Sequence, residues 1–214
     1  ARFDKIKQVK AGILDIGYAE VGPQSGRTVI LLHGWPYDIH SFTESAAILA
    51  TKGFRVIVPH LRGHGSTTFL SSESPRNGQQ SALALDVIAL MDALKISKAI
   101  IGGFDWDAIF ERSAASLDHP DHVAIVIHNY RWRLGLAEGE PQYDVLEKQL
   151  ATAPVINVPA ITLEGDANAA PHPDPSAYAL KFKARYSHRN LSGGIGHNLP
   201  QEAPQAFADA IIEV

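Results

Sequence analysis

The chain has 214 residues, of which 45% are hydrophobic and 20% are charged, as is typical of a globular domain with a sizeable core. Its formal net charge of −4 gives no electrostatic reason to expect nucleic acid or an anionic membrane as a partner. The chain has no cysteine, which excludes disulfides, thiolate metal sites and a cysteine nucleophile. The first residues are polar and no apolar run reaches membrane-spanning length, so we expect a cytoplasmic protein. The only methionine is Met91, so we expect the original start of the chain to lie upstream of Ala1.

Strands and helices alternate along most of the chain. Strands are expected at 3–10, 12–21, 28–32, 54–58, 99–103, 158–163 and 187–191, and helices at 41–52, 79–94, 176–182 and 202–212. The apolar, β-branched run Thr28–Leu32 is typical of a strand that is buried on both faces of a parallel sheet. This order predicts an α/β fold with a mostly parallel sheet flanked by helices.

The most informative motif is Gly103-Phe104-Asp105-Trp106, directly after a predicted strand. In hydrolases with a Gly-x-Ser-x-Gly elbow, a sharp strand-to-helix turn lifts the nucleophile above the edge of the sheet. Asp105 stands where those enzymes carry serine, so a nucleophile at this position would be a carboxylate. A carboxylate can displace a leaving group at an sp3 carbon and form an alkyl ester, which a general base then helps water to hydrolyse. An aspartate that caps the next helix is the alternative interpretation.

A second motif, His33-Gly34-Trp35-Pro36, follows the predicted strand at 28–32. Ligands of open parallel sheets bind beyond the carboxyl ends of the strands. A glycine-containing turn at this place lets a backbone N–H point into the site, and Trp35 is the expected donor. His33 either lines this site or is a hydrogen-bonded histidine of the core.

Two more candidates follow late strands. Asp166 comes after the strand at 158–163, where a carboxylate can hold an imidazole in its correct tautomer. His197 lies in the glycine-rich loop 193–200, before the last helix. The chain order of turn, nucleophile, acid and histidine is that of the α/β-hydrolase fold. We therefore expect Asp105, Asp166 and His197 to converge in one pocket, with His197 within hydrogen-bond reach of Asp166.

Over nearly its whole length the chain resembles the α/β-hydrolase superfamily, and its aspartate nucleophile is similar to that of epoxide hydrolases and haloalkane dehalogenases. The matching motifs are His33-Gly34-Trp35-Pro36, Leu61-Arg62-Gly63-His64-Gly65-Ser66 and Gly103-Phe104-Asp105-Trp106. His60 stands where the family usually has aspartate. No Gly-x-Ser-x-Gly occurs, which disfavours a serine esterase or lipase.

The resemblance implies a cofactor-free hydrolase that acts on a small apolar organic substrate. Asp105 attacks carbon, His197 activates water and Asp166 orients His197. The backbone N–H groups of Trp35 and Trp106 hold the oxyanion.

The segment His128-Asn129-Tyr130-Arg131-Trp132 is similar to the cap segment in which epoxide hydrolases place a ring-opening tyrosine, so Tyr130 is expected to protonate the opening oxygen. The function expected first is therefore that of an epoxide hydrolase. A haloalkane or haloacid dehalogenase and a non-catalytic binding member of the fold are the alternatives.

Two features depart from the family pattern. Asp107 stands where a small residue normally follows the tryptophan, and a second carboxylate so close would raise one pKa and weaken the nucleophile. The other feature is length, because only residues 106–165 separate Asp105 from Asp166, where family members carry an inserted helical cap.

The short interval allows two interpretations. In the first, 107–117 is the helix after the elbow, Val123–Ile127 is the next core strand and 129–157 is a reduced lid. In the second, 107–150 is a remnant of the cap, and a helix and a strand of the core are missing. No turn signal interrupts the segment through Leu134, which favours a helix over 121–134. In both cases we expect one domain over 1–214, with 107–157 as a reduced lid or cap.

No metal or cofactor is expected. His119 and His122 are three residues apart, but no third ligand shows a suitable spacing with them. The chain also lacks Gly-x-Gly-x-x-Gly after its first strand, so a dinucleotide cofactor is not expected.

Overall fold

The computed structural model describes residue 3 and residues 5–104, 117–168 and 175–214. Its strands are β1 (Ile6–Ala11), β2 (Leu14–Val21), β3 (Thr28–Leu32), β4 (Arg55–Pro59), β5 (Thr68–Phe69), β6 (Ile100–Gly103), β7 (Ala160–Gly165) and β8 (Tyr186–Leu191). Its helices are η1 (Ile39–Phe42), α1 (Thr43–Thr51), α2 (Gln80–Ala93), α4 (His122–Arg133), η2 (Pro141–Tyr143), α5 (Asp144–Ala151), α6 (Pro175–Ala179), α7 (Leu199–Glu202) and α8 (Pro204–Glu213). Within the described ranges no helix is both long and apolar enough to span a membrane.

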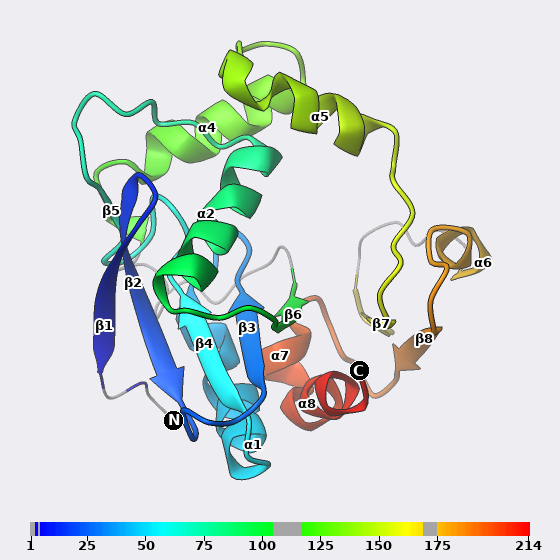
Figure 1. Ribbon diagram of the computed structural model, residues 1–214. Coiled ribbons are helices and arrows are strands. Elements are labelled where there is room, and N and C mark those ends of the chain that lie inside the picture. The colour runs from blue at the N-terminus through cyan, green and yellow to red at the C-terminus, as the bar shows by residue number, and fades with distance from the viewer. Residues whose placement is uncertain (1–2, 4, 105–116, 169–174) are drawn as a thin grey trace.

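The predicted α/β fold is confirmed. The larger sheet has the strand order β1-β2-β4-β3-β6, and β5 pairs with β2 (Figure 1). Strand β3 runs parallel to β4 and β6, whereas β2 is antiparallel to both of its neighbours β1 and β4. Strands β7 and β8 form a separate parallel pair. The sheet is therefore mixed, with its parallel part in the middle and at the β6 edge.

Strand β3 is buried on both faces, as its apolar run predicts. The side chains of Val29, Ile30 and Leu31 are all 0% exposed. Val29 and Leu31 belong to the cluster that also contains Leu49 of α1 and Phe207 of α8. Ile30 belongs to a second cluster on the opposite face, with residues of α2. The period-two alternation of a strand thus divides one short run between two hydrophobic cores.

The segment 118–157 answers the question left open by the sequence. Val123–Ile127 lies inside helix α4, so the core strand expected there by the first interpretation is wrong, and the helix expected over 121–134 is confirmed. The β-branched run is helical because its context outweighs its strand propensity. Gly135 adopts φ 70°, and the N–H of Leu136 donates to the carbonyl of Arg131, which ends the helix in a Schellman motif. Helix α5 and β5 were not predicted, and the expected helix at 107–117 lies almost entirely outside the described residues.

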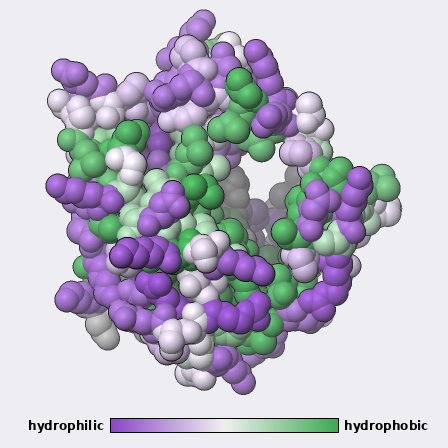
Figure 2. All heavy atoms as spheres, in the orientation of Figure 1, coloured by the Kyte–Doolittle hydropathy of each residue, from purple (hydrophilic) through white to green (hydrophobic). Residues whose placement is uncertain are grey.

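A gap separates the two sheets. In the described part of the chain β6 pairs with β3 alone and β7 pairs with β8 alone, so each has one edge without a strand. A cavity of about 650 Å³ lies between β6 and β7, above residues of α8. The side chain of Ile101 in β6 is 51% exposed. Figure 2 shows that this side of the molecule is deeply hollowed. A core strand between β6 and β7 is missing from the described structure, as the second interpretation expects.

Candidate active site

The register between β3 and β6 brings the first two motifs together. Leu32 pairs with Gly103, so the turn that starts at His33 and the residue Phe104 leave the sheet at the same edge. The Phe104 ring lies 4.9 Å from the ring of Tyr37, between ring centroids. Phe104 therefore fixes the end of β6 against the chain that follows the turn. The next two residues, Asp105 and Trp106, lie outside the described residues, so the structure gives no position for the expected nucleophile.

A cavity of about 410 Å³ opens at this edge. Its walls come from the turn 33–35, the loop after β4, and helices α2 and α4. Three of the expected site residues, His33, Trp35 and Tyr130, line it. The apolar wall consists of Leu32, Leu61, Leu83, Val87, Phe104, Ile125 and Val126. Such a cavity, with a few polar groups, is suited to a small organic molecule.

His33 binds backbone groups of the turn and of the loop after β4. It is 3% exposed, and its Nδ1 lies 3.0 Å from the carbonyl of Gly34 while its Nε2 accepts the N–H of Leu61 at 3.1 Å. A carbonyl only accepts, so the ring is neutral with its proton on Nδ1. Burial lowers the pKa of His33, which keeps the ring neutral. Both ring nitrogens are engaged with backbone, so His33 shapes the cavity wall.

The neighbouring histidines form a row along this wall. The rings of His33 and His64 are 4.7 Å apart, those of His64 and His122 are 4.6 Å apart, and both contacts are edge-to-face. Burial lowers the pKa of His64 and that of His122, and it lowers the pKa of His60 beneath the row to about 4. The row is therefore uncharged at neutral pH.

Trp35 is contacted from α4. Its indole N–H donates to His122 Nε2 at 2.9 Å, and the Tyr130 ring lies edge-on to the indole at 6.4 Å. Tyr130 is 37% exposed, so its ring lies at the mouth of the cavity.

Arg62 supports the loop after β4. Its guanidinium binds both carboxylate oxygens of Asp86 in α2, at 2.6 and 2.7 Å, and donates to the carbonyl of Asn77 at 2.8 Å. The Arg62 side chain is 1% exposed and that of Asp86 is 13% exposed. A buried arginine requires such complete pairing, because an unpaired buried charge is very unfavourable.

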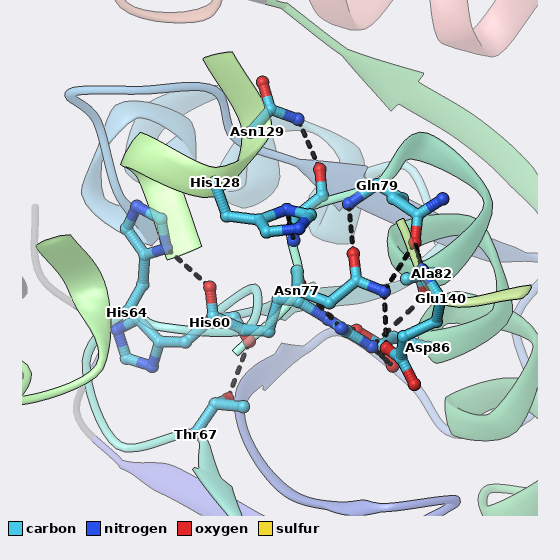
Figure 3. A network of polar contacts seen from close by, with 12 residues as sticks. His60, His64, Thr67, Asn77, Gln79, Ala82, Asp86, His128, Asn129 and Glu140 are labelled. Atoms are coloured by element: carbon cyan, nitrogen blue, oxygen red, sulfur yellow. Dashed lines mark hydrogen bonds and ion pairs between the residues drawn. The ribbon is translucent and has the colours of Figure 1, made fainter. Parts of the chain in front are cut away.

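A polar network fastens α4 and the chain after it to residues 77–81 (Figure 3). The N–H of Gly78 donates to His128 Nδ1 at 3.2 Å, and the side-chain amide of Asn129 donates to the Gly78 carbonyl. The N–H of Glu140 donates to Gln79 Oε1 at 2.7 Å. A Cβ at Gly78 would lie 2.6 Å from the carbonyl oxygen of Ile125, so only glycine permits this close approach.

Asp166 and His197 lie together at the end of β7. The Asp166 carboxylate accepts the N–H groups of Gly193, Gly194 and Ile195, each at 2.9 Å. The bonds from Gly193 and Ile195 are the main reason that the pKa of this carboxyl is lowered. His197 Nδ1 lies 3.2 Å from Asn168 Oδ1, two residues beyond Asp166. Asp166 thus holds the loop that carries His197, and Asn168 contacts the ring, in place of the hydrogen bond from His197 to Asp166 that the sequence predicts.

One contact joins this loop to the first half of the site. The side-chain amide of Asn198 donates to Ser41 Oγ at 3.3 Å, and Ser41 belongs to η1, just after the turn. The structure therefore brings Trp35, His33 and Tyr130 around one cavity, whereas Asp166 and His197 lie beyond the end of β7, in the separate sheet, and neither is among the described residues that line this cavity.

Sequence reasoning missed Asn168 and His122. Asn168 carries a local signal, because a polar side chain two residues after a candidate acid can reach the same loop. His122 carries none, because its partner Trp35 is 87 residues away and the contact depends on where α4 docks. In the described part of the chain no group of His, Asp or Glu side chains could hold a metal ion.

Comparisons with known proteins agree on the family. Residues 27–129 match the family model described as alpha/beta hydrolase fold. A solved structure from Klebsiella pneumoniae, described as a candidate epoxide hydrolase, is 42% identical, with a TM-score of 0.95 over 99% of this chain and 97% of that chain. Epoxide hydrolase I from potato has a TM-score of 0.68 at 16% identity over 98% of each chain, a likeness of fold alone.

Curated relatives match about half of this chain. Epoxide hydrolase 3 from Siraitia grosvenorii is 37% identical over 110 residues, which are 51% of this chain and 33% of that protein. Epoxide hydrolase A from Mycobacterium tuberculosis is 32% identical over 107 residues, 50% of this chain and 32% of that protein. The matched part thus covers about a third of the length of these relatives.

Proposed function

The chain belongs to the α/β-hydrolase fold family, in the branch similar to epoxide hydrolases, and we propose that it hydrolyses epoxides through an ester on Asp105. One observation carries the proposal. The register of Leu32 with Gly103 sets the start of the Gly103-Phe104-Asp105-Trp106 motif beside the turn that contains Trp35, at the edge of a largely apolar cavity. A carboxylate nucleophile at that position matches the chemistry of ring opening at carbon.

The first step forms the ester. A carboxylate oxygen of Asp105 attacks an epoxide carbon, the C–O bond of the ring breaks, and the oxygen leaves with the bonding electron pair. Tyr130 donates its hydroxyl proton to that oxygen, since an alkoxide is a poor leaving group and an ordinary tyrosine is protonated at neutral pH. The place of Tyr130 on the cavity wall supports this role.

The second step hydrolyses the ester. His197 takes a proton from water, and the hydroxide adds to the ester carbonyl. The backbone N–H groups of Trp35 and Trp106 hold the oxyanion of the tetrahedral intermediate. The intermediate collapses with cleavage of the ester C–O bond, and the departing alkoxide takes the proton of the added hydroxyl group, which gives the diol and the Asp105 carboxylate. The proton on His197 then returns through solvent to the Tyr130 oxygen, which restores both side chains. Asp166 keeps the loop of His197 in place, which its hydrogen bonds to the N–H groups of 193–195 support.

We further propose that 1–214 acts as one domain and that 107–157 is its reduced cap. Two hydrogen bonds, from the N–H of Gly78 to His128 of α4 and from the N–H of Glu140 to Gln79, support a cap that is docked over the cavity. Asp107 follows the nucleophile by two residues in the sequence, and its negative charge is expected to slow the first step.

The test measures diol formation from a terminal aryl epoxide and halide release from a haloalkane of matched size. We expect diol formation by the wild-type chain, loss of all turnover in Asp105→Ala and in His197→Ala, and faster turnover in Asp107→Gly. Tyr130→Phe is expected to slow the epoxide reaction alone, since a halide leaves without a proton. Asp92→Asn, which removes an exposed carboxylate of α2, is the control. Halide release without diol formation would favour a dehalogenase, and no reaction with either substrate would favour a binding protein.

A further inference from the structure

Helix α4 reaches the 33–36 turn through one side-chain hydrogen bond. The indole N–H of Trp35 donates to Nε2 of His122, at 2.9 Å. The other ring nitrogen of His122, Nδ1, lies 2.9 Å from the carbonyl oxygen of Gly63. An indole N–H only donates and a carbonyl only accepts, so both contacts form only when His122 is neutral and carries its proton on Nδ1.

The surroundings hold this contact tightly. The backbone of Gly63 adopts φ 74°, and a Cβ there would lie 2.8 Å from the end of the Ile125 side chain, so loop and helix are closely packed. His122 is 6% exposed. The ring of Tyr130, which follows His122 by eight residues in α4, contacts the same indole edge-on. Trp35 is therefore contacted by two residues of one helix.

We propose that His122 is a positioning residue that holds the Trp35 side chain, and with it the turn whose backbone N–H serves the reaction. The inference rests on the proposed function for its effect on turnover, but the hydrogen bond itself is independent of it. The backbone N–H of Trp35 is therefore correctly placed only when α4 is docked, although α4 supplies no oxyanion donor of its own.

Protonation of His122 breaks the contact. A second proton would sit on Nε2 and point at the N–H of Trp35, so that two donors face each other. The titratable groups that face the ring are His64, from the loop after β4, and His119, from the turn before α4, with His33 behind His64. Among the described residues no carboxylate contacts the ring, and the Asp121 carboxylate is bound to Arg76. Burial lowers the pKa of His122 below its ordinary value of 6.5, so the contact is intact at neutral pH and is lost in acid.

The test follows the indole N–H signals of the nitrogen-15-labelled protein by NMR. The chain has three tryptophans, and the signal missing from Trp35→Phe is that of Trp35. As the pH is lowered from 8, we expect the Trp35 signal of the wild type to move from a bonded to an unbonded position on the acid side of 6.5. His122→Phe should show the unbonded position at every pH. His122→Gln places a carbonyl oxygen near the position of Nε2, so it should show the bonded position without titrating.

His188→Phe is the matched control, since it removes a hydrogen-bonded histidine of β8 that does not touch Trp35. Its Trp35 signal should titrate as in the wild type. At pH 8, we expect His122→Phe to lower kcat about tenfold with little change in KM, the equivalent of one lost hydrogen bond, and His122→Gln to recover most of this loss.

The NMR signals test whether the hydrogen bond from Trp35 to His122 exists, and the kinetics test whether it affects turnover. A Trp35 signal that is identical in the wild type and His122→Phe overturns the proposal, as does an equal response of the signal to His188→Phe. An altered signal with unchanged kcat in His122→Phe overturns the positioning role. If the wild type turns over no epoxide, the proposed function fails, and the altered Trp35 signal alone then supports the hold of His122 on the turn.

Discussion

The two sheets support the two halves of the site in different ways. In β3, which carries the 33–36 turn, Val29, Ile30 and Leu31 are 0% exposed and face two hydrophobic cores. In β7, which carries Asp166, every residue except Gly165 is only half-buried, and β8 has no buried residue. The turn therefore rests on a packed core, whereas Asp166 and His197 rest on a strand pair that no third strand joins among the described residues.

Because of this difference, we expect the β3 side to determine the stability of the fold and the β7 side to affect mainly turnover. Apolar burial supplies most of the stability of a small domain, so the β3 side determines whether the chain stays folded. The β7 side is fastened largely by loop hydrogen bonds, such as those from 193–195 to Asp166. Substitutions on the β3 side should therefore lower the free energy of unfolding, and those on the β7 side should mainly change turnover.

The largest effect is expected from a buried ion pair. Asp86→Ala leaves the Arg62 guanidinium, which is 1% exposed, without its carboxylate, and should lower the free energy of unfolding by about 3–5 kcal/mol. Glu213→Gln removes the partner of Arg189 on the β8 side, where both side chains are well exposed, and should leave the stability unchanged within error. Urea unfolding measures both, and equal losses would remove the distinction between the two sides.

A second comparison uses one residue type in paired strands. Ile30 of β3 and Ile101 of β6 are register partners, but Ile30 is 0% and Ile101 is 51% exposed. Ile30→Ala should cost about 3 kcal/mol, because it leaves a cavity in the core. Ile101→Ala should cost less than about 1 kcal/mol. A large loss from Ile101→Ala would mean that the open edge of β6 is covered in solution.

The buried histidines should make the β3 side sensitive to acid. The pKa of His60 is about 4 in the folded chain, below its ordinary value of 6.5, so the unfolded chain binds the proton first. The free energy of unfolding should therefore fall as the pH drops from 6.5 to 4, by about 3 kcal/mol from this group.

His60→Gln removes this titration and should flatten that part of the profile, which urea unfolding at several pH values measures. The pKa values of His33, His64 and His122 are also lowered in the folded chain, so these groups also make the free energy of unfolding fall in acid. The variant should therefore keep a smaller dependence of stability on pH. A wild-type stability that is constant over this range would contradict the burial of the histidine row.

The smallest effect concerns the ring of His197. Asn168→Ala removes the side chain 3.2 Å from His197 Nδ1 and should lower kcat about tenfold, the equivalent of one hydrogen bond, with no loss of stability. Asn157→Ala, an exposed residue just before β7, is the control. If Asn168→Ala unfolds the chain instead, the β7 side carries more stability than its exposure indicates.

The sequence predicts best what local patterns determine. The bounds of β3 are predicted to the residue, because polar residues end its β-branched apolar run on both sides. The 33–36 turn and Asp166 were placed at strand ends for the same reason, and the structure has them there.

Contacts that depend on docking were beyond the sequence. Val123–Ile127 has strand propensity, yet it is helical. Its Ile125 side chain packs closely against Gly63, and the helix that contains it continues to the Schellman motif at Gly135. The bond from Trp35 to His122 and the network around Asn77 join segments far apart in the chain, for which no local pattern exists.

The ester on Asp105 is the central claim, and the mass of the His197→Ala protein after incubation with an epoxide tests it most directly. Without the general base, attack proceeds but hydrolysis does not, so the protein should gain the mass of one epoxide, on the peptide that contains Asp105. Asp105→Ala combined with His197→Ala should gain nothing. An unmodified His197→Ala protein, or an adduct on another residue, would contradict the account.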